Sequence, residues 1–167
     1  MSAPQPKRLP WLLAISAAAY AADQLSKIWV SHRIPLGGFI PLIPHVLRIT
    51  HWNNEGAAFS IFADSARPHA VRWGLVAFTV AASLAVVALM VRWGSRVRVA
   101  TVALALILGG AIGNLHDRIA YGSVIDFIGV NIFGYPWPDF NIADSCIVTG
   151  ACLLVLDSLL AQKQDAE

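Results

Sequence analysis

The chain has 167 residues, of which 57% are hydrophobic and only 13% are charged. A soluble domain carries about 25% charged residues, so this much apolar surface cannot be buried in one soluble core and a lipid bilayer is the expected solvent. The net charge of +2, carried by scattered basic residues, excludes a nucleic-acid-binding surface, which needs a clustered basic face. The length predicts one membrane-embedded domain over residues 1–167.

Four apolar stretches are long enough to cross the hydrocarbon core, which takes about 20 helical residues. They cover residues 9–30, 70–91, 99–119 and 142–160. The predicted fold is an all-α polytopic membrane protein with four transmembrane helices. Two longer connections, residues 31–69 and 120–141, are expected to lie on one side of the membrane and to include a small β-containing region.

The first long connection contains two β-prone pieces, residues 39–43 and 46–52, which are bounded by prolines and glycines. They predict a small sheet that rests on the membrane surface. The second long connection is rich in apolar side chains, which are expected to form one patch at the membrane interface. The residues of this expected patch are Val124, Phe127, Ile128, Val130, Ile132 and Phe133.

Basic residues near the ends of the spans predict the orientation, because such residues collect on the cytoplasmic side. They are Lys7 and Arg8 before the first span, three arginines within residues 92–98, and Lys163 after the last span. Four spans put all of these on one side, so both termini are expected in the cytoplasm and both long connections outside. The arginines of the first outward connection fit this pattern less well.

Polar side chains within the spans are concentrated near the outward ends, where alternating spans bring distant positions together. Asp23 and Lys27 are four residues apart, share a helix face and can form an ion pair. Asn141 also fits the N-cap of the fourth span. Any one of these residues is compatible with an ordinary helix cap, but the whole set at one face indicates a functional site. The set consists of Asp23, Lys27, Asn114, Asp117, Arg118, Asp126, Asn141 and Asp144.

The residue types in this set limit the chemistry to carboxylates in a poorly hydrated setting. The sequence has no recognisable Ser–His, Cys–His or metal-ligand pattern at this face, so neither a metal nor a cofactor is expected. Two carboxyl groups that lie close together cannot both ionise. The ionised one can take a proton from water while the other donates to an amide carbonyl, as in an aspartic peptidase.

Five segments together resemble the ordered motif set of the lipoprotein signal peptidases, also called signal peptidase II. The segments are Asp23-Gln24-Leu25-Ser26-Lys27, Asn54-Glu55-Gly56-Ala57-Ala58-Phe59, Gly110-Ala111-Ile112-Gly113-Asn114-Leu115-His116-Asp117-Arg118, Val124-Ile125-Asp126-Phe127 and Phe140-Asn141-Ile142-Ala143-Asp144-Ser145. They extend over nearly the whole chain in the order and spacing of that family, which makes the combination specific although each motif alone is weak.

The resemblance implies that Asp126 and Asp144 form a catalytic dyad. The supporting positions that it implies are Asp23, Lys27, Asn54, Gly56, Asn114, Arg118, Asn141 and Ala143. The two asparagines Asn114 and Asn141 are expected to hydrogen-bond the dyad or the substrate, and Arg118 to offset nearby carboxylates by a bidentate contact. Asp117 is either part of the site or the structural partner of an arginine.

The function implied is an intramembrane aspartic endopeptidase that removes signal peptides from diacylglyceryl-modified prolipoproteins, just before the lipidated cysteine. It implies a bacterial inner-membrane enzyme, with its active site at the outer face, that meets membrane lipid, is inhibited by globomycin-type cyclic peptides and is a monomer. The apolar patch is expected to clamp the substrate. Replacing Phe127, Ile128 and Ile132 by serine is then expected to weaken cleavage without unfolding the protein.

Two other classes of protein fit a small chain with several spans: a transporter or proton-conducting protein with paired carboxylates, and a structural scaffold. A conducting protein tends to place ionisable groups near the membrane midplane or along a path across it. The middle of the second, third and fourth spans is almost free of charge. The sequence therefore favours a site at one face of the membrane over a conduction path.

Overall fold

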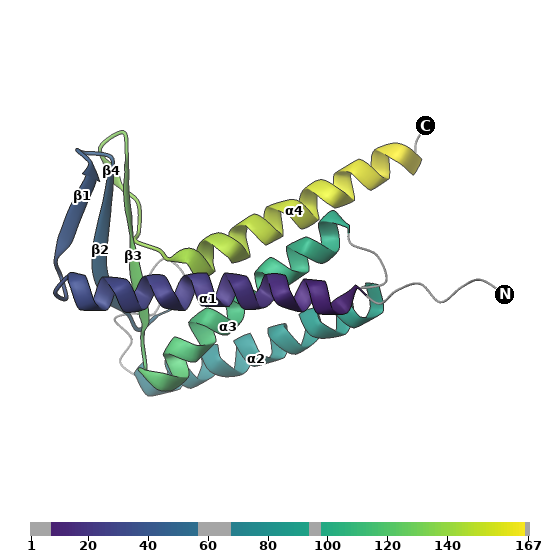
Figure 1. Ribbon diagram of the computed structural model, residues 1–167, viewed down its shortest axis with the longest axis horizontal. Coiled ribbons are helices and arrows are strands. Elements are labelled where there is room, and N and C mark those ends of the chain that lie inside the picture. Colours follow the sequence, from purple (N-terminus) through teal and green to yellow (C-terminus); the bar gives the residue numbers. More distant parts are fainter. Residues whose placement is uncertain (1–7, 57–67, 94–97, 166–167) are drawn as a thin grey trace.

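The computed structural model describes residues 8–56, 68–93 and 98–165. Its helices are α1 (Leu9–Arg33), α2 (Pro68–Trp93), α3 (Val99–Ala120) and α4 (Ile142–Asp165). Each of the four apolar stretches recognised in the sequence lies within one of these helices. In Figure 1 the helices lie side by side, with the start of α1 and the end of α4 at the same end of the molecule.

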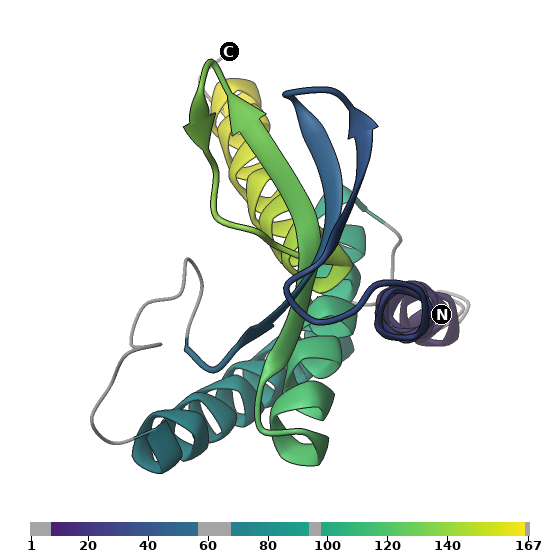
Figure 2. The same ribbon diagram turned by 90° about the vertical axis from the view of Figure 1, so that its left-hand side faces the viewer.

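The helix α3 occupies the centre and packs against the other three, as the end-on view in Figure 2 shows. Two adjacent glycines allow this close packing. A Cβ atom on Gly109 would lie 2.5 Å from the backbone oxygen of Ser16 in α1, and one on Gly110 would overlap the backbone of Ala143 in α4. Small residues let helix backbones approach one another, as they do in membrane helix pairs.

Three of the helices in the described part of the chain are long and apolar enough to cross a membrane. They are His69–Trp93, Val99–Ala120 and Ile142–Gln162. The helix α1 is long enough, with 25 residues, but the polar residues Asp23, Gln24 and Lys27 lower its apolar content. The prediction of a multi-pass membrane protein is confirmed for three spans, and the fourth predicted span is not confirmed by length and composition.

The two long connections join in one antiparallel sheet. Its strands are β1 (Phe39–Ile43), β2 (Leu47–Asn54), β3 (Val124–Ile132) and β4 (Tyr135–Pro136), in that spatial order. The sheet lies across the end of the helices where α1 and α3 finish and α2 and α4 begin (Figure 1). The small sheet predicted for the first connection is confirmed, and it is completed by strands from the second.

The expectation of one exposed apolar patch in the second connection is wrong, because most of that segment is the strand β3. The side chains of a strand alternate between its two faces, and in β3 residues of both faces are buried, among them Val124, Asp126 and Phe127. Phe127 is only 5% exposed and packs against Val30 of α1 and Ile34 just after it, whereas Ile132 and Phe133 are exposed. Serine at Phe127 is therefore expected to damage the core, so the triple-serine variant is not a clean test of a clamp.

Candidate active site

Three carboxylates, Asp126, Asp139 and Asp144, line one cavity of about 480 Å³. Asp126 comes from β3 and Asp144 from the first turn of α4. Asn54 at the end of β2 lines the same cavity, together with residues 137–140 and the next turn of α4. The sheet and the end of the helices thus bring together residues that the sequence separates.

Asp126 is buried, with 5% of its surface exposed, and it accepts two amide hydrogen bonds. Asn54 donates from Nδ2 to Oδ2 of Asp126 over 2.9 Å, and Asn141 donates from Nδ2 to Oδ1 over 2.8 Å. The pairing of β2 with β3 supplies the first contact, because it sets Trp52 opposite Asp126 and Asn54 opposite Val124. Both oxygens of Asp126 are therefore held by neutral donors.

Burial raises the pKa of Asp126 to about 7, because a poorly hydrated site disfavours the charged form. The hydrogen bonds from Asn54 and Asn141 act in the opposite direction, while the negative charge of Asp144 raises this pKa further. Asp126 therefore exchanges its proton near neutral pH, which suits a group that must act as an acid in one step and as a base in another.

Asp144 lies at the N-terminus of α4, where Asn141 is the N-cap. The backbone N–H of Asp144 donates to Oδ1 of Asn141 over 2.9 Å, and the backbone N–H of Asn141 donates to Oδ2 of Asp144 over 3.2 Å. This reciprocal pair is a capping box with an aspartate in the third position. Asn114 of α3 donates from Nδ2 to Oδ1 of Asp144 over 2.8 Å. The hydrogen bonds expected from Asn114 and Asn141 to the carboxylates are present.

A buried ion cluster lies beneath the two carboxylates. Nζ of Lys27 is 2.8 Å from Oδ2 of Asp23 and 2.7 Å from Oδ2 of Asp117. Asp23 also accepts the backbone N–H of Ala143 over 3.0 Å, which joins α1 to α4. The sequence left an arginine as one possible partner for Asp117, but the ion pair observed is with Lys27, because α1 and α3 pack face to face there.

Arg118 does not make the bidentate carboxylate contact expected from the sequence. Within the described ranges its guanidinium donates to the backbone oxygens of Gly56, over 3.0 Å, and of Asn114, over 3.4 Å. The backbone N–H of Gly56 in turn donates to Oδ1 of Asn54 over 2.9 Å. Arg118 and Gly56 therefore hold the end of β2 and orient the amide of Asn54. The following motif residues, 57–59, lie outside the described residues.

Gln24 belongs to the buried cluster although the sequence analysis gave it no role. Its Nε2 donates to Oδ1 of Asp117 over 2.9 Å, to Oδ2 of Asp23 over 3.1 Å and to the backbone oxygen of Gly113 over 3.3 Å. A search for ionisable groups passes over a neutral amide. The sequence signal that could have identified Gln24 is its position between Asp23 and Lys27, the two charged residues of the site on α1.

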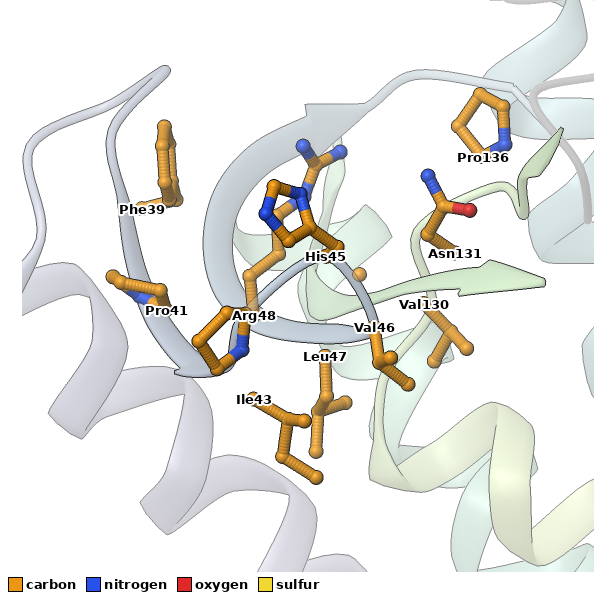
Figure 3. Close-up of a pocket in the computed structure, with 12 residues that line it drawn as sticks. Phe39, Pro41, Ile43, His45, Val46, Leu47, Arg48, Val130, Asn131 and Pro136 are labelled. Atoms are coloured by element: carbon orange, nitrogen blue, oxygen red, sulfur yellow. The ribbon is translucent and has the colours of Figure 1, made fainter. Parts of the chain in front are cut away.

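A second cavity, also of about 480 Å³, lies over the sheet and is drawn in Figure 3. Phe39 and Pro41 of β1, Arg48 of β2 and Val130 of β3 line it, and its described lining contains no carboxylate. It therefore lacks the groups that hydrolysis needs. Within the described part of the chain, no group of three or more His, Cys, Asp or Glu residues is arranged to hold a metal ion.

Comparisons with known proteins agree with this geometry. The family model described as Signal peptidase (SPase) II matches residues 15–160. The chain belongs to the signal peptidase II family. A lipoprotein signal peptidase of Burkholderia mallei (strain SAVP1) is 41% identical over 150 residues, which cover 90% of this chain and 87% of that protein. One of Geobacter metallireducens is 37% identical over 155 residues, which cover 92% and 93% of the two chains.

Two solved bacterial membrane enzymes, determined by the in meso method at 2.3 and 1.9 Å, have the same fold. The first has a TM-score of 0.84 and 29% identity and covers 99% of this chain and 97% of its own. The second has a TM-score of 0.80 and 31% identity and covers 95% and 98%. Membership of this family makes the chain an aspartic endopeptidase and does not favour a transporter.

Proposed function

We propose that the chain removes signal peptides from diacylglyceryl-modified prolipoproteins and cuts just before the lipidated cysteine, with Asp126 and Asp144 acting as a dyad. The observation that carries this proposal is the single cavity lined by Asp126 and Asp144 in a chain of the signal peptidase II family. Their charges are coupled, since that of Asp144 raises the pKa of Asp126. Such a pair holds one proton between its members near neutral pH.

The reaction uses that one proton. The ionised carboxylate takes a proton from water while the water oxygen bonds to the scissile carbonyl carbon, and the protonated carboxyl group donates to the carbonyl oxygen. The resulting tetrahedral diol collapses when a proton passes to the amide nitrogen and the C–N bond breaks. The products are the carboxyl end of the signal peptide and the free amine of the lipidated cysteine, and the dyad recovers its original protonation.

In this proposal α1 crosses the membrane as well, which gives four spans in one domain. Its charged residues Asp23 and Lys27 are buried within the protein, whereas Leu25, Ile28 and Trp29 are exposed. A helix of this kind meets lipid with its apolar face and keeps its ion pair inside. Four spans put both termini in the cytoplasm and the active site at the outer face of the bacterial inner membrane, as the basic residues predict.

The substrate is held by its lipid as much as by its peptide. Acyl chains in the outer leaflet bring the scissile bond to the level of the headgroups, which lowers the entropic cost of positioning it. The cavity continues past Asp144 along Ile147, Val148 and Thr149 of α4, a mainly apolar wall that suits such a ligand. Globomycin-type cyclic peptides are expected to compete for this cavity. The enzyme is expected to work as a monomer without metal or cofactor, so a chelator leaves cleavage intact.

The test is cleavage of a diacylglyceryl-modified precursor in liposomes by the wild type, Asp126→Asn and Asp144→Asn. Each substitution is expected to lower kcat by at least about 100-fold, since a general acid or base contributes about 10²- to 10⁴-fold. Asp157→Asn is the matched control, because Asp157 lies on α4 several turns beyond Asp144 and does not line the cavity. Near-normal cleavage by either dyad variant would overturn the proposal.

A further inference from the structure

Asp126 and Asp144 have different hydrogen-bond partners. Those of Asp144 include Asn114, which is in turn hydrogen-bonded to Lys27. Nζ of Lys27 donates to Oδ1 of Asn114 over 3.1 Å, and Nδ2 of the same asparagine donates to Oδ1 of Asp144 over 2.8 Å. Lys27 is 2% exposed and Asn114 is also buried. A chain of two hydrogen bonds therefore connects the buried cation to one carboxylate of the dyad.

The cation determines which way the amide of Asn114 points. An ammonium group has donors only, and an asparagine offers an oxygen at one end and an NH₂ group at the other. Because Lys27 faces one end of the amide, that end must be the oxygen, and the NH₂ group must face Asp144. Asn141 also donates to this oxygen, but over 3.2 Å and as a neutral group. Asn141 has a closer acceptor in Asp126, at 2.8 Å.

Asp144 is arranged to be the ionised member of the pair. It accepts the amide N–H of Asn114 and the backbone N–H of Asn141, and it lies in the first turn of α4, where the helix dipole favours negative charge. Asp126 lies on the strand β3 and not in the first turn of a helix. The charged groups around Asp144 are Asp23 and Lys27 on α1, Asp117 and Arg118 on α3, and Asp126 on β3. Asp139 lines the same cavity and accepts the hydroxyl of Thr50 over 2.6 Å.

We infer that Lys27 is a positioning residue of the reaction. By holding the oxygen of Asn114, it turns the amide N–H toward Asp144 and keeps Asp144 as the carboxylate that takes the proton from water, which leaves Asp126 as the carboxyl group that donates to the substrate carbonyl. This inference rests on the proposed dyad and assigns its two roles. Without Lys27, the amide of Asn114 is free to turn its oxygen toward Asp144, which favours the protonated form of that carboxyl group.

The variant that tests this is Lys27→Met combined with Asp117→Asn. Removing Lys27 alone would leave two buried carboxylates without a cation, which is strongly destabilising. The combined variant removes one charge of each sign, so the net charge of the cluster stays the same. Asp23 keeps its hydrogen bonds from Gln24 and Ala143. The altered features are then the donor that faces the oxygen of Asn114 and the positive charge near Asp144, and the Asn114→Ala background described below separates the two.

In the combined variant, kcat near neutral pH is expected to fall by about 10- to 100-fold, the effect of one charged hydrogen bond, with little change in KM. Loss of activity on acidification is expected at a higher pH than in the wild type, because Asp144 protonates more readily. Asp117→Asn alone is the control: it keeps Lys27 on Asn114 and should keep the wild-type pH profile. An unchanged profile in the combined variant would overturn the inference.

Coupling to Asn114 separates this role from simple bracing of α1 against α3. If Lys27 acts through Asn114, the combined variant made in an Asn114→Ala background should show no further loss of kcat beyond Asn114→Ala itself. Two losses that multiply would mean that Lys27 acts by another route. In that case the dyad proposal stands, provided that Asp126→Asn and Asp144→Asn are inactive, and only the role given to Lys27 fails.

A second measurement tests the assignment of roles even if the combined variant does not fold. Infrared spectra of the resting enzyme at mildly acidic pH report the C=O stretch of a protonated carboxyl group. This band should persist in Asp144→Asn and disappear in Asp126→Asn. Each of these variants replaces a single carboxyl group by an amide. The opposite pattern would make Asp144 the acid and would remove the reason given for the contact between Lys27 and Asn114.

Discussion

The buried position of Asp126 disfavours the charged form of its carboxyl group, and this lowers the free energy of unfolding when that group is ionised. Its pKa is raised to about 7, chiefly by burial, whereas in the unfolded chain it ionises near its ordinary value of 3.8. Between these two values the folded protein holds a proton that the unfolded chain has lost. The stabilising contribution of this proton is therefore complete below about pH 4 and is lost as the pH rises to about 7.

The stability of the wild type is expected to fall with rising pH relative to Asp126→Asn. The difference in unfolding free energy between the two should change by up to about 4 kcal/mol from pH 4 to pH 7 and then become constant. Thermal unfolding in detergent at a series of pH values checks this, with Asp157→Asn as a control for the loss of a carboxylate away from the cavity. Parallel stability curves for the wild type and Asp126→Asn would contradict it.

The sequence predicted which polar residues lie at one end of the molecule better than it predicted their partners. Alternating spans place Asp23, Asn114 and Asp144 at one end of the molecule whatever the rotation of each helix. Partner choice depends on that rotation, which side-chain packing decides. Hence Lys27 pairs with Asp117 as well as with Asp23, and Arg118 binds backbone oxygens rather than a carboxylate.

At the level of elements, the helices could be predicted from the sequence because each contains a long apolar run. The strand β3 could not be predicted in this way. The segment Val124–Ile132 is rich in apolar residues, which fits either a surface loop that meets lipid or a half-buried strand. What decides between them is its pairing with β2, a contact between residues 70 or more positions apart. That same pairing brings Asn54 to Asp126, so this part of the site could not be read from local sequence.

The close contact between α1 and α3 depends on glycine at residue 113. A Cβ atom there would lie 2.5 Å from Oδ2 of Asp23, the oxygen that Lys27 contacts. Gly113→Ala is therefore expected to lower stability by about 1–3 kcal/mol, as overpacking does, and to reduce cleavage by displacing the ion pair. Thermal unfolding and cleavage assays on the purified variant measure both effects.

Gly74→Ala is the matched control for this helix contact. Gly74 lies in α2, and a Cβ atom there would meet nothing within 4 Å. Alanine is favoured over glycine in a helix by about 1 kcal/mol, so this variant should be as stable as the wild type or slightly more stable. If both alanine variants unfold at the same temperature and cleave equally well, Gly113 is not required for the packing of α1 against α3.

In the whole molecule, the apolar outer faces of the helices are separated from a polar region at one end. The four helices run side by side, and the sheet closes the end at which both carboxylates lie (Figures 1 and 2). The buried ion cluster between α1 and α3 lies just inside that end. This arrangement allows a water-consuming reaction beside lipid, because the charged groups are enclosed by protein while the outer faces of the helices stay apolar.

The number of spans follows from whether α1 crosses the bilayer, and labelling of single cysteines decides it. In a chain with Cys146 and Cys152 replaced by serine, Tyr135→Cys on the sheet should react with a membrane-impermeant maleimide in intact spheroplasts. Pro10→Cys at the start of α1 and Ala161→Cys near the end of α4 should react only after permeabilisation, because four spans put both on the cytoplasmic side. Labelling of Pro10→Cys in intact spheroplasts would mean that α1 does not cross and that the ion pair of Asp23 and Lys27 anchors a surface helix to three spans.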